Sequence, residues 1–395
     1  MLRYPVRRSV LMISENHWTG FSRYLQDNFE TFTFIYYKHP SGYAGGPAIE
    51  CKSYQNGTLV RSEYFLARRA SLLLAIRRIH AQLLGLIEYL YAIALILRSK
   101  KRYDLFITAN YTLVTWLAPR LKLGYKSVIV SCDVVLNTNS IIKKLKNTIF
   151  LGLERVVEDS ADAVWYLTPE MLTMKKRQGI ARRNNIPRMV VPMPIAERIS
   201  SQFEEIQRHQ IVYFGYVGPR RGLELAIESL NQIIHKVPDV TLTIIGLENP
   251  VYSSRLKSEI AQRGLSDHIK FVGYVEDMNK VRKIISKSAV GIAIYDSHTL
   301  RYGQSNRFLE YLACGVPVVV NKEINLWSQV VQTGAGIVID YDLSQLTRAL
   351  LDLLTDDVVW ANCREGVAKM YDVLRNEKKY EYALSELLGL GVKSR

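Results

Sequence analysis

The sequence predicts an α/β fold in which helices cover both faces of a parallel sheet, and two observations support this prediction. Between residues 211 and 354, short apolar runs alternate with segments of helical periodicity, the order typical of a doubly wound sheet. Several runs also end in glycine, the residue expected where a strand turns tightly into a helix. The predicted strands are 211–215, 241–246, 269–273 and 290–295.

The segment 305–320, SNRFLEYLACGVPVVV, predicts a buried helix that leads directly into a strand. Apolar residues recur at helical spacing, so one face of the helix is expected to pack inward. Ser305 is the predicted N-cap, Gly315 ends the helix in a left-handed conformation, and Pro317 prevents it from resuming. The β-branched run after the proline is typical of a buried strand.

A second face of this helix carries Asn306 and Glu310, four residues apart. Helical side chains lean toward the N-terminus, so Glu310 is expected to point to the end with unpaired amides. Such an end suits a phosphate, and a nearby carboxylate suits the hydroxyls of a ribose. The segment therefore predicts a nucleotide-diphosphate site. The alternative is a core helix with one exposed glutamate.

A second candidate element is the turn in 211–222, IVYFGYVGPRRG. Gly215 ends the strand, and Arg220 and Arg221 follow in the loop before the next helix. Open α/β sheets bind ligands at the carboxyl ends of their strands, and an arginine there can donate two parallel hydrogen bonds to a pyrophosphate. The alternative is a solvated basic turn.

Taken in order, GY-x-GPRRGLELAIESL, TLTIIG, IKFVGYV and SNRFLEYLACGVPVVV resemble the nucleotide-binding half of GT-B glycosyltransferases, most closely the large group called family 4. The resemblance covers 211–354 well and the first half only in outline. It implies that Arg221, where the family usually has lysine, contacts the donor diphosphate. It also implies that Glu310 binds the ribose and that the backbone at Gly273 and Tyr274 holds the base.

Some positions depart from the family pattern. The family usually has a glutamate eight positions before Glu310, which contacts the transferred sugar, and here Tyr302 stands there. Tyr216 replaces a frequent arginine, for which Arg220 is a substitute, and Arg307 stands where related sequences often have lysine. The sugar and the stereochemistry of transfer therefore stay open. The predicted donor site comprises Gly215, Arg220, Arg221, Gly273, Tyr274, Tyr302, Ser305, Asn306, Arg307 and Glu310.

Charge divides the chain into two halves. The net charge is +15, and all of this excess lies in residues 1–195, while 196–395 carry as many basic as acidic residues. A proline-containing linker, VPMPI, stands at the boundary. We therefore expect a GT-B arrangement of two facing Rossmann-like domains with an interdomain cleft. The expected parts are a basic acceptor domain (1–195), a nucleotide-sugar domain (205–365) and a C-terminal helix crossing back (366–395).

A basic domain implies an anionic partner. Nucleic acid is disfavoured because no recognised binding module is visible, and an anionic membrane surface fits better. The segment 68–102 predicts a long apolar helix flanked by arginines and lysines and interrupted by Glu88. The unbroken apolar stretch after Glu88 is too short for the ~20 residues that a transmembrane span requires. It is expected either to lie in the membrane interface or to pack in the domain core. Lys143, Lys144 and Lys146 add a second basic amphipathic patch.

The composition indicates the cellular compartment in which the protein is expected. The 48% hydrophobic and 23% charged residues are typical of a globular protein, and the N-terminus lacks the apolar length of a signal peptide. Four cysteines without a CxxC pair favour a reducing compartment. We expect a cytoplasmic protein bound peripherally to the inner face of the membrane.

The chemistry is expected to need no metal and no cofactor. Arg221 and the helix N-terminus at Ser305 would stabilise the departing diphosphate. Asp340 and Asp342 resemble a metal-binding DxD motif, but Asp342 is interpreted as a helix cap. Asp133, at the end of an apolar strand, is the candidate general base, in a segment similar to that of xanthan-type glucuronosyltransferases, and is open to the alternative of a loop cap. His17 is a weaker candidate for positioning a substrate.

These observations favour a glycosyltransferase that moves a sugar from a nucleotide-diphosphate sugar, UDP- or GDP-linked, to a lipid-linked saccharide in cell-surface polysaccharide synthesis. One alternative is a nucleotide-sugar 2-epimerase, which needs no second substrate and hence no basic acceptor half. The other is an inactive nucleotide-sugar or membrane-binding protein, which is suggested by Tyr302.

Overall fold

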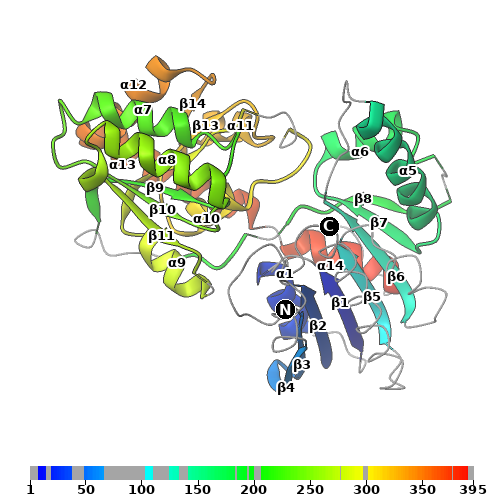
Figure 1. Ribbon diagram of the computed structural model, residues 1–395. Coiled ribbons are helices and arrows are strands. Elements are labelled where there is room, and N and C mark those ends of the chain that lie inside the picture. The colour runs from blue at the N-terminus through cyan, green and yellow to red at the C-terminus, as the bar shows by residue number, and fades with distance from the viewer. Residues whose placement is uncertain are drawn as a thin grey trace. The chain divides into compact units, whose positions relative to one another are not determined.

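The computed structural model describes residues 8–14, 19–37, 49–65, 103–109, 124–132, 141–182, 185–193, 195–199, 206–275, 277–296, 301–375 and 377–389. The chain forms two compact units (Figure 1). Unit 1 consists of residues 1–193 and 377–395, and unit 2 of residues 194–376. Each unit is built on its own sheet.

Unit 1 contains an eight-stranded sheet in the order β4-β3-β2-β1-β5-β6-β7-β8. Its strands are β1 (Ser9–Ser14), β2 (Thr31–Tyr37), β3 (Ile49–Gln55), β4 (Thr58–Phe65), β5 (Tyr103–Ala109), β6 (Gly124–Ser131), β7 (Ala163–Tyr166) and β8 (Arg188–Val190). Its described helices are α1 (Thr19–Asn28), α5 (Ile141–Glu158), α6 (Pro169–Arg177) and α14 (Glu377–Leu388).

The sheet of unit 1 is parallel except at one edge. β3 pairs antiparallel with both β2 and β4. The hairpin turns at Asn56 and Gly57, which both have positive φ, +48° and +79°. Asn-Gly favours this two-residue turn because its twist matches that of the flanking strands.

Unit 2 contains a six-stranded, fully parallel sheet in the order β11-β10-β9-β12-β13-β14, as the alternating pattern predicts. Its strands are β9 (Gln207–Phe214), β10 (Thr241–Ile245), β11 (Ile269–Gly273), β12 (Ser288–Ala293), β13 (Val318–Asn321) and β14 (Gly336–Ile339). Its helices are α7 (Leu223–Ile233), α8 (Pro250–Gln262), α9 (Met278–Ile285), α10 (Asn306–Ala313), α11 (Trp327–Thr333), α12 (Leu343–Thr355) and α13 (Asp357–Leu374), with a short 3₁₀ helix at Ser266–His268.

The helical C-terminal region is divided between the two units. α13 belongs to unit 2, where Trp360 donates from its indole N–H to the carbonyl of Ala289 at 2.9 Å. α14 belongs to unit 1, where Tyr380 packs against the rings of Phe21 and Tyr24. The chain therefore enters unit 1 again at Glu377, later than the expected residue 366, because the apolar face of α13 is buried in unit 2.

No helix in the described part of the chain is long and apolar enough to cross a membrane. The apolar segment 68–102 lies outside the described residues.

Candidate functional site

Glycines line the carboxyl ends of three neighbouring strands in unit 2. Gly215 follows β9 with φ +130°, and its N–H donates to the carbonyl of Ile245 at 2.8 Å. Gly246 follows β10 with φ +150°, and a Cβ there would overlap the Gly215 carbonyl. Its N–H donates to the carbonyl of Gly273, the last residue of β11, at 2.9 Å. The strand ends therefore carry no side chain at these three positions, where a parallel sheet binds ligands; Gly215 and Gly273 are half-buried and Gly246 is buried.

The loop after β9 leads to an uncapped helix. Gly222, with φ +79°, is the N-cap of α7, and no side chain caps that helix end. A Cβ on Gly222 would overlap Ile294, so only glycine fits. Because no side chain occupies the first-turn N–H groups of α7, they are open to an anion.

The two arginines of this loop differ. The Nε of Arg220 donates to the carbonyl of Asp296 at 2.6 Å, and its backbone has φ +64°. Arg221 is exposed, and its guanidinium lies 5.9 Å from the ring centre of Tyr295. None of the described carboxylates forms an ion pair with Arg221, so this side chain is the one available to a ligand.

α10 begins as the sequence predicts. The Ser305 hydroxyl accepts from the N–H of Phe308 at 3.3 Å, which confirms the N-cap. The same hydroxyl lies 2.9 Å from that of Tyr295. Ser305 is therefore committed to the protein, while Asn306 is exposed at the first position of the helix.

Arg307 is the most unusual side chain of the site. It is only 5% exposed, and its guanidinium carbon lies 3.8 Å from the ring centre of Tyr213 and 5.0 Å from that of Tyr295. Its Nη1 lies 3.5 Å from the carbonyl of Arg221, and its guanidinium lies beside Gly215. Its Nε has no hydrogen-bond partner, and no carboxylate in the described chain pairs with it.

The environment of Arg307 keeps it charged. Burial by itself lowers the pKa of a guanidinium, but the hydroxyls of Tyr213, Tyr295 and Tyr311 outweigh burial and raise the pKa of Arg307. Burial raises the pKa of Tyr213 to about 12 despite the nearby cation. A buried cation that is partnered by aromatic rings and lacks an anion is a favourable place for an anionic ligand.

The carboxylate of Glu310 is nearly buried and already occupied. Its two oxygens accept from Nε and Nη2 of Arg282, on α9, at 2.7 and 3.0 Å. Burial opposes the charge of Arg282, but the hydrogen bonds and charge of Glu310 prevail and raise the pKa of Arg282. Arg282 therefore holds the Glu310 carboxylate, and the binding of the ribose by Glu310 stays a prediction.

The structure brings Gly215, Arg221 and Arg307 together around the end of β9. Tyr274 follows β11 and is half exposed, and Tyr302 lies half-buried in the turn before α10. Four further residues of the site were not predicted from the sequence: Arg282, Tyr213, Tyr295 and Tyr311. Tyr311 could have been suspected because it directly follows Glu310 in the sequence. Its contacts with β9 and β12 could not be predicted, because those strands are distant in the chain.

The remaining candidates fall outside this site. Asp342 caps α12, accepting from the N–H of Gln345 at 2.9 Å, so its interpretation as a cap is confirmed. Asp340 pairs with Lys322 at 3.0 Å. Within the described residues, no group of three His, Cys, Asp or Glu side chains gathers as metal ligands would. Asp133 and His17 lie outside the described residues.

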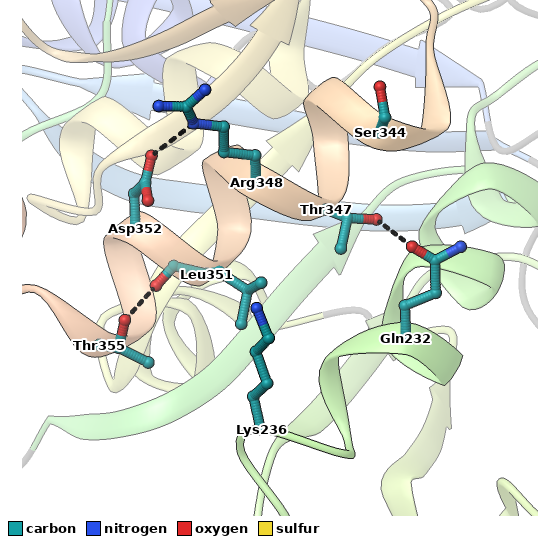
Figure 2. A pocket seen from close by; sticks show the side chains of 8 residues that line it. All are labelled: Gln232, Lys236, Ser344, Thr347, Arg348, Leu351, Asp352 and Thr355. Carbon is teal, nitrogen blue, oxygen red and sulfur yellow. Dashed lines mark hydrogen bonds and ion pairs between the residues drawn. The ribbon is translucent and has the colours of Figure 1, made fainter.

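A groove between α7 and α12 is separate from the site (Figure 2). Its polar residues pair with one another, for example Arg348 with Asp352 at 3.9 Å and Thr347 with Gln232 at 3.4 Å. No residue from the loop after β9 or from α10 lines it, so we assign it no function.

Residues 208–356, which contain all of this geometry, match the family model described as "Glycosyl transferases group 1". Over the whole chain, the structure is similar to a UDP-forming α,α-trehalose-phosphate synthase from Burkholderia xenovorans. The TM-score is 0.67 and the identity 12%, with 98% of this chain and 100% of that chain covered. It is also similar to HepE of Anabaena in complex with UDP, with TM-score 0.62, 14% identity and coverage of 96% and 100%.

The chain has the GT-B fold.

The curated relatives of this GT-B protein match segments of similar length, about 150 residues. One is the GDP-mannose-dependent alpha-(1-6)-phosphatidylinositol monomannoside mannosyltransferase of Mycolicibacterium smegmatis, 27% identical over 152 residues, which are 38% of this chain and 39% of that protein. Another is the lipopolysaccharide core biosynthesis mannosyltransferase LpcC of Rhizobium leguminosarum, 25% identical over 154 residues, which are 38% of this chain and 42% of that protein. The similarity thus spans about two fifths of these relatives.

Proposed function

We propose that this protein is a glycosyltransferase that transfers a sugar from a nucleotide-diphosphate sugar to a saccharide acceptor. The group 1 match over the nucleotide-binding unit and the GT-B fold support the reaction class. The site at the carboxyl ends of β9, β10 and β11 supports a nucleotide-diphosphate donor. Its strand ends are glycines, and Arg221 and Arg307 lie next to them as partners for a diphosphate.

The observation that carries this proposal is Arg307. Burying a cation without a counter-ion costs free energy. Arg307 is buried beside Gly215 at the end of β9, and an anion bound there would offset that cost. A diphosphate fits between Arg307, Arg221 and the uncapped N-terminus of α7. The same groups would stabilise the charge that develops as the nucleoside diphosphate leaves, in the role that a metal ion has in other transferases.

We propose a UDP- or GDP-linked donor and a lipid-linked acceptor at the cytoplasmic face of the membrane. A structural neighbour is bound to UDP, and a curated relative is GDP-mannose-dependent and named for a phosphatidylinositol mannoside acceptor. The basic charge of residues 1–195 supports an anionic surface. Asp133 as the general base stays a prediction.

The test is a thermal-shift screen of the purified protein with UDP, GDP, dTDP and ADP. A ligand that binds only the folded state raises the melting temperature in proportion to the logarithm of its concentration over Kd. We expect a shift with one nucleotide that is lost in Arg307→Gln and Arg221→Ala. The exposed Arg348→Gln is the matched control and should keep the shift.

No shift with any nucleotide, or a shift that persists in both site variants, would overturn the proposed donor site. An assay with and without the acceptor then distinguishes a transferase from an epimerase. A transferase releases nucleoside diphosphate from the donor sugar only as fast as acceptor is glycosylated, whereas an epimerase changes the sugar with no acceptor present.

A further inference from the structure

Helix α5 of unit 1 presents an apolar ridge to solvent. Leu145, Ile149, Leu153 and Val156 recur at spacings of four, four and three residues, so they lie on one face. They are 65, 58, 59 and 48% exposed, and Phe150 beside them is also exposed. Around Gly152, on the same face, a Cβ would meet no atom within 4 Å. Large apolar side chains gathered in this way mark an interaction surface.

The acidic residues of α5 are directed away from this face. Glu154 and Glu158 are the only carboxylates of the helix, and both are fully buried. Glu154 pairs with Lys175 of α6, and Glu158 accepts from the hydroxyl of Tyr166 at 2.6 Å. Both carboxylates are therefore paired inside unit 1, and the exposed face of α5 carries none.

Basic residues are also found on α5 and on the neighbouring helix α6. The sequence places Lys143, Lys144 and Lys146 in the first two turns, and Lys144 is exposed. The neighbouring helix α6, which is tied to α5 through Lys175, adds exposed Lys176 and Arg177 in its last turn. The exposed cations described on the two helices are thus Lys144, Lys176 and Arg177, against one exposed carboxylate, Glu170 of α6, and none on α5.

We propose that the exposed face of α5 binds the surface of an anionic lipid bilayer. An amphipathic helix binds such an interface by burying its apolar face at the headgroup boundary, while lysines and arginines attract anionic headgroups. A second copy of the chain is a poorer occupant, because a symmetric contact would bring the lysines of two copies together. The proposed function includes a lipid-linked acceptor at the membrane, and the α5 face is the surface that would bind that membrane. Only the link to a lipid acceptor rests on the proposed function.

The experiment is co-sedimentation of the full chain with vesicles of phosphatidylcholine alone or mixed with phosphatidylglycerol. We expect binding only to the mixed vesicles, weakened by high salt. The double variant Ile149→Asp/Leu153→Asp should lower the partition coefficient by about tenfold or more, because it removes buried apolar area and adds repulsion. Val358→Asp, an equally exposed apolar position on α13 of unit 2, is the matched control and should bind as wild type.

Folding of the double variant is checked by its melting temperature and its nucleotide-induced shift, both of which should match wild type. Equal vesicle binding by the double variant and wild type would overturn the inference. So would a wild-type dimer that the double variant converts to a monomer while vesicle binding stays unchanged, because the face would then join two copies. Vesicle binding without any nucleotide shift would instead contradict the proposed donor site and leave the α5 surface intact.

Discussion

Arg282 and Glu310 form a two-point ion pair, with Nε 2.7 Å from one carboxylate oxygen and Nη2 3.0 Å from the other. Each carboxylate oxygen has a further lone pair, so Glu310 can still accept hydroxyl groups while Arg282 holds it. The arginine fixes the plane of the carboxylate that the family resemblance assigns to the ribose. We therefore predict that Arg282 is a positioning residue for nucleotide recognition.

Replacing Arg282 with glutamine should impair recognition of the ribose and the stability of unit 2. Because the pair is largely buried, its loss should lower the free energy of unfolding by about 3 kcal/mol. Urea denaturation would measure this change. The affinity advantage of the bound nucleotide over its 2′,3′-dideoxy form should fall by about tenfold, because a hydrogen bond to a charged group is lost. Calorimetric titration measures this ratio.

A double-mutant cycle with Glu310→Gln distinguishes positioning from general destabilisation. If Arg282 acts through Glu310, the loss of ribose discrimination in the double variant equals that of either single variant. The control Arg348→Gln breaks an exposed pair and should change the unfolding free energy by less than about 1 kcal/mol. Full ribose discrimination in Arg282→Gln would show that the positioning role is wrong.

Arg307→Met should separate stability from binding. The methionine fills similar space without a buried charge, so we expect the unfolding free energy of the ligand-free protein to stay equal or rise. Nucleotide binding should fall below detection because the diphosphate loses its buried partner. Urea denaturation with and without nucleotide measures both effects. A large loss of stability in the ligand-free protein would mean that the stacking on Tyr213 is structural.

Tyr311→Phe should destabilise unit 2 through the backbone of β9. The Tyr311 hydroxyl accepts from the N–H of Phe214 at 2.8 Å and lies 3.2 Å from the carbonyls of Val212 and Ile292. Leaving a buried N–H unpaired costs about 1–3 kcal/mol, which urea denaturation detects. Tyr216→Phe is the control, since the Tyr216 side chain is exposed and its hydroxyl accepts from the amide of half-buried Asn249 at 3.1 Å, and its effect should be within about 0.5 kcal/mol.

Two glycines of the site should respond differently to alanine. In Gly246→Ala the new Cβ overlaps the Gly215 carbonyl, so the strand ends must move, at a cost of about 3 kcal/mol or more. Gly273→Ala meets no atom within 4 Å, and its φ of +77° costs only about 1–2 kcal/mol. Denaturation curves compare the two. Equal losses would mean that backbone conformation, and not close contact, requires Gly246.

The alternation of strands and helices determined the parallel sheet of unit 2, because hydrophobic periodicity depends only on neighbours along the chain. For the same reason the caps at Ser305 and Asp342 were predictable, since each bonds to an amide three residues away. Family resemblance added the predicted roles of Arg221 and Glu310, which stay predictions. The antiparallel hairpin of unit 1 was missed, although Asn56 and Gly57 provided its turn signal.

Only the tertiary structure decided which of these groups are free. Arg307 and Tyr213 are 94 positions apart in the chain, and Arg282 and Glu310 are 28 apart, so no local pattern could show that one arginine would stack on an aromatic ring and the other would hold a carboxylate. The exposed apolar face of α5 likewise could not be predicted locally. It lacks carboxylates because Glu154 and Glu158 are buried and pair with Lys175 and Tyr166 inside unit 1. Sequence periodicity sets the faces of an element, whereas packing between distant segments sets which charges are neutralised and which remain for a ligand.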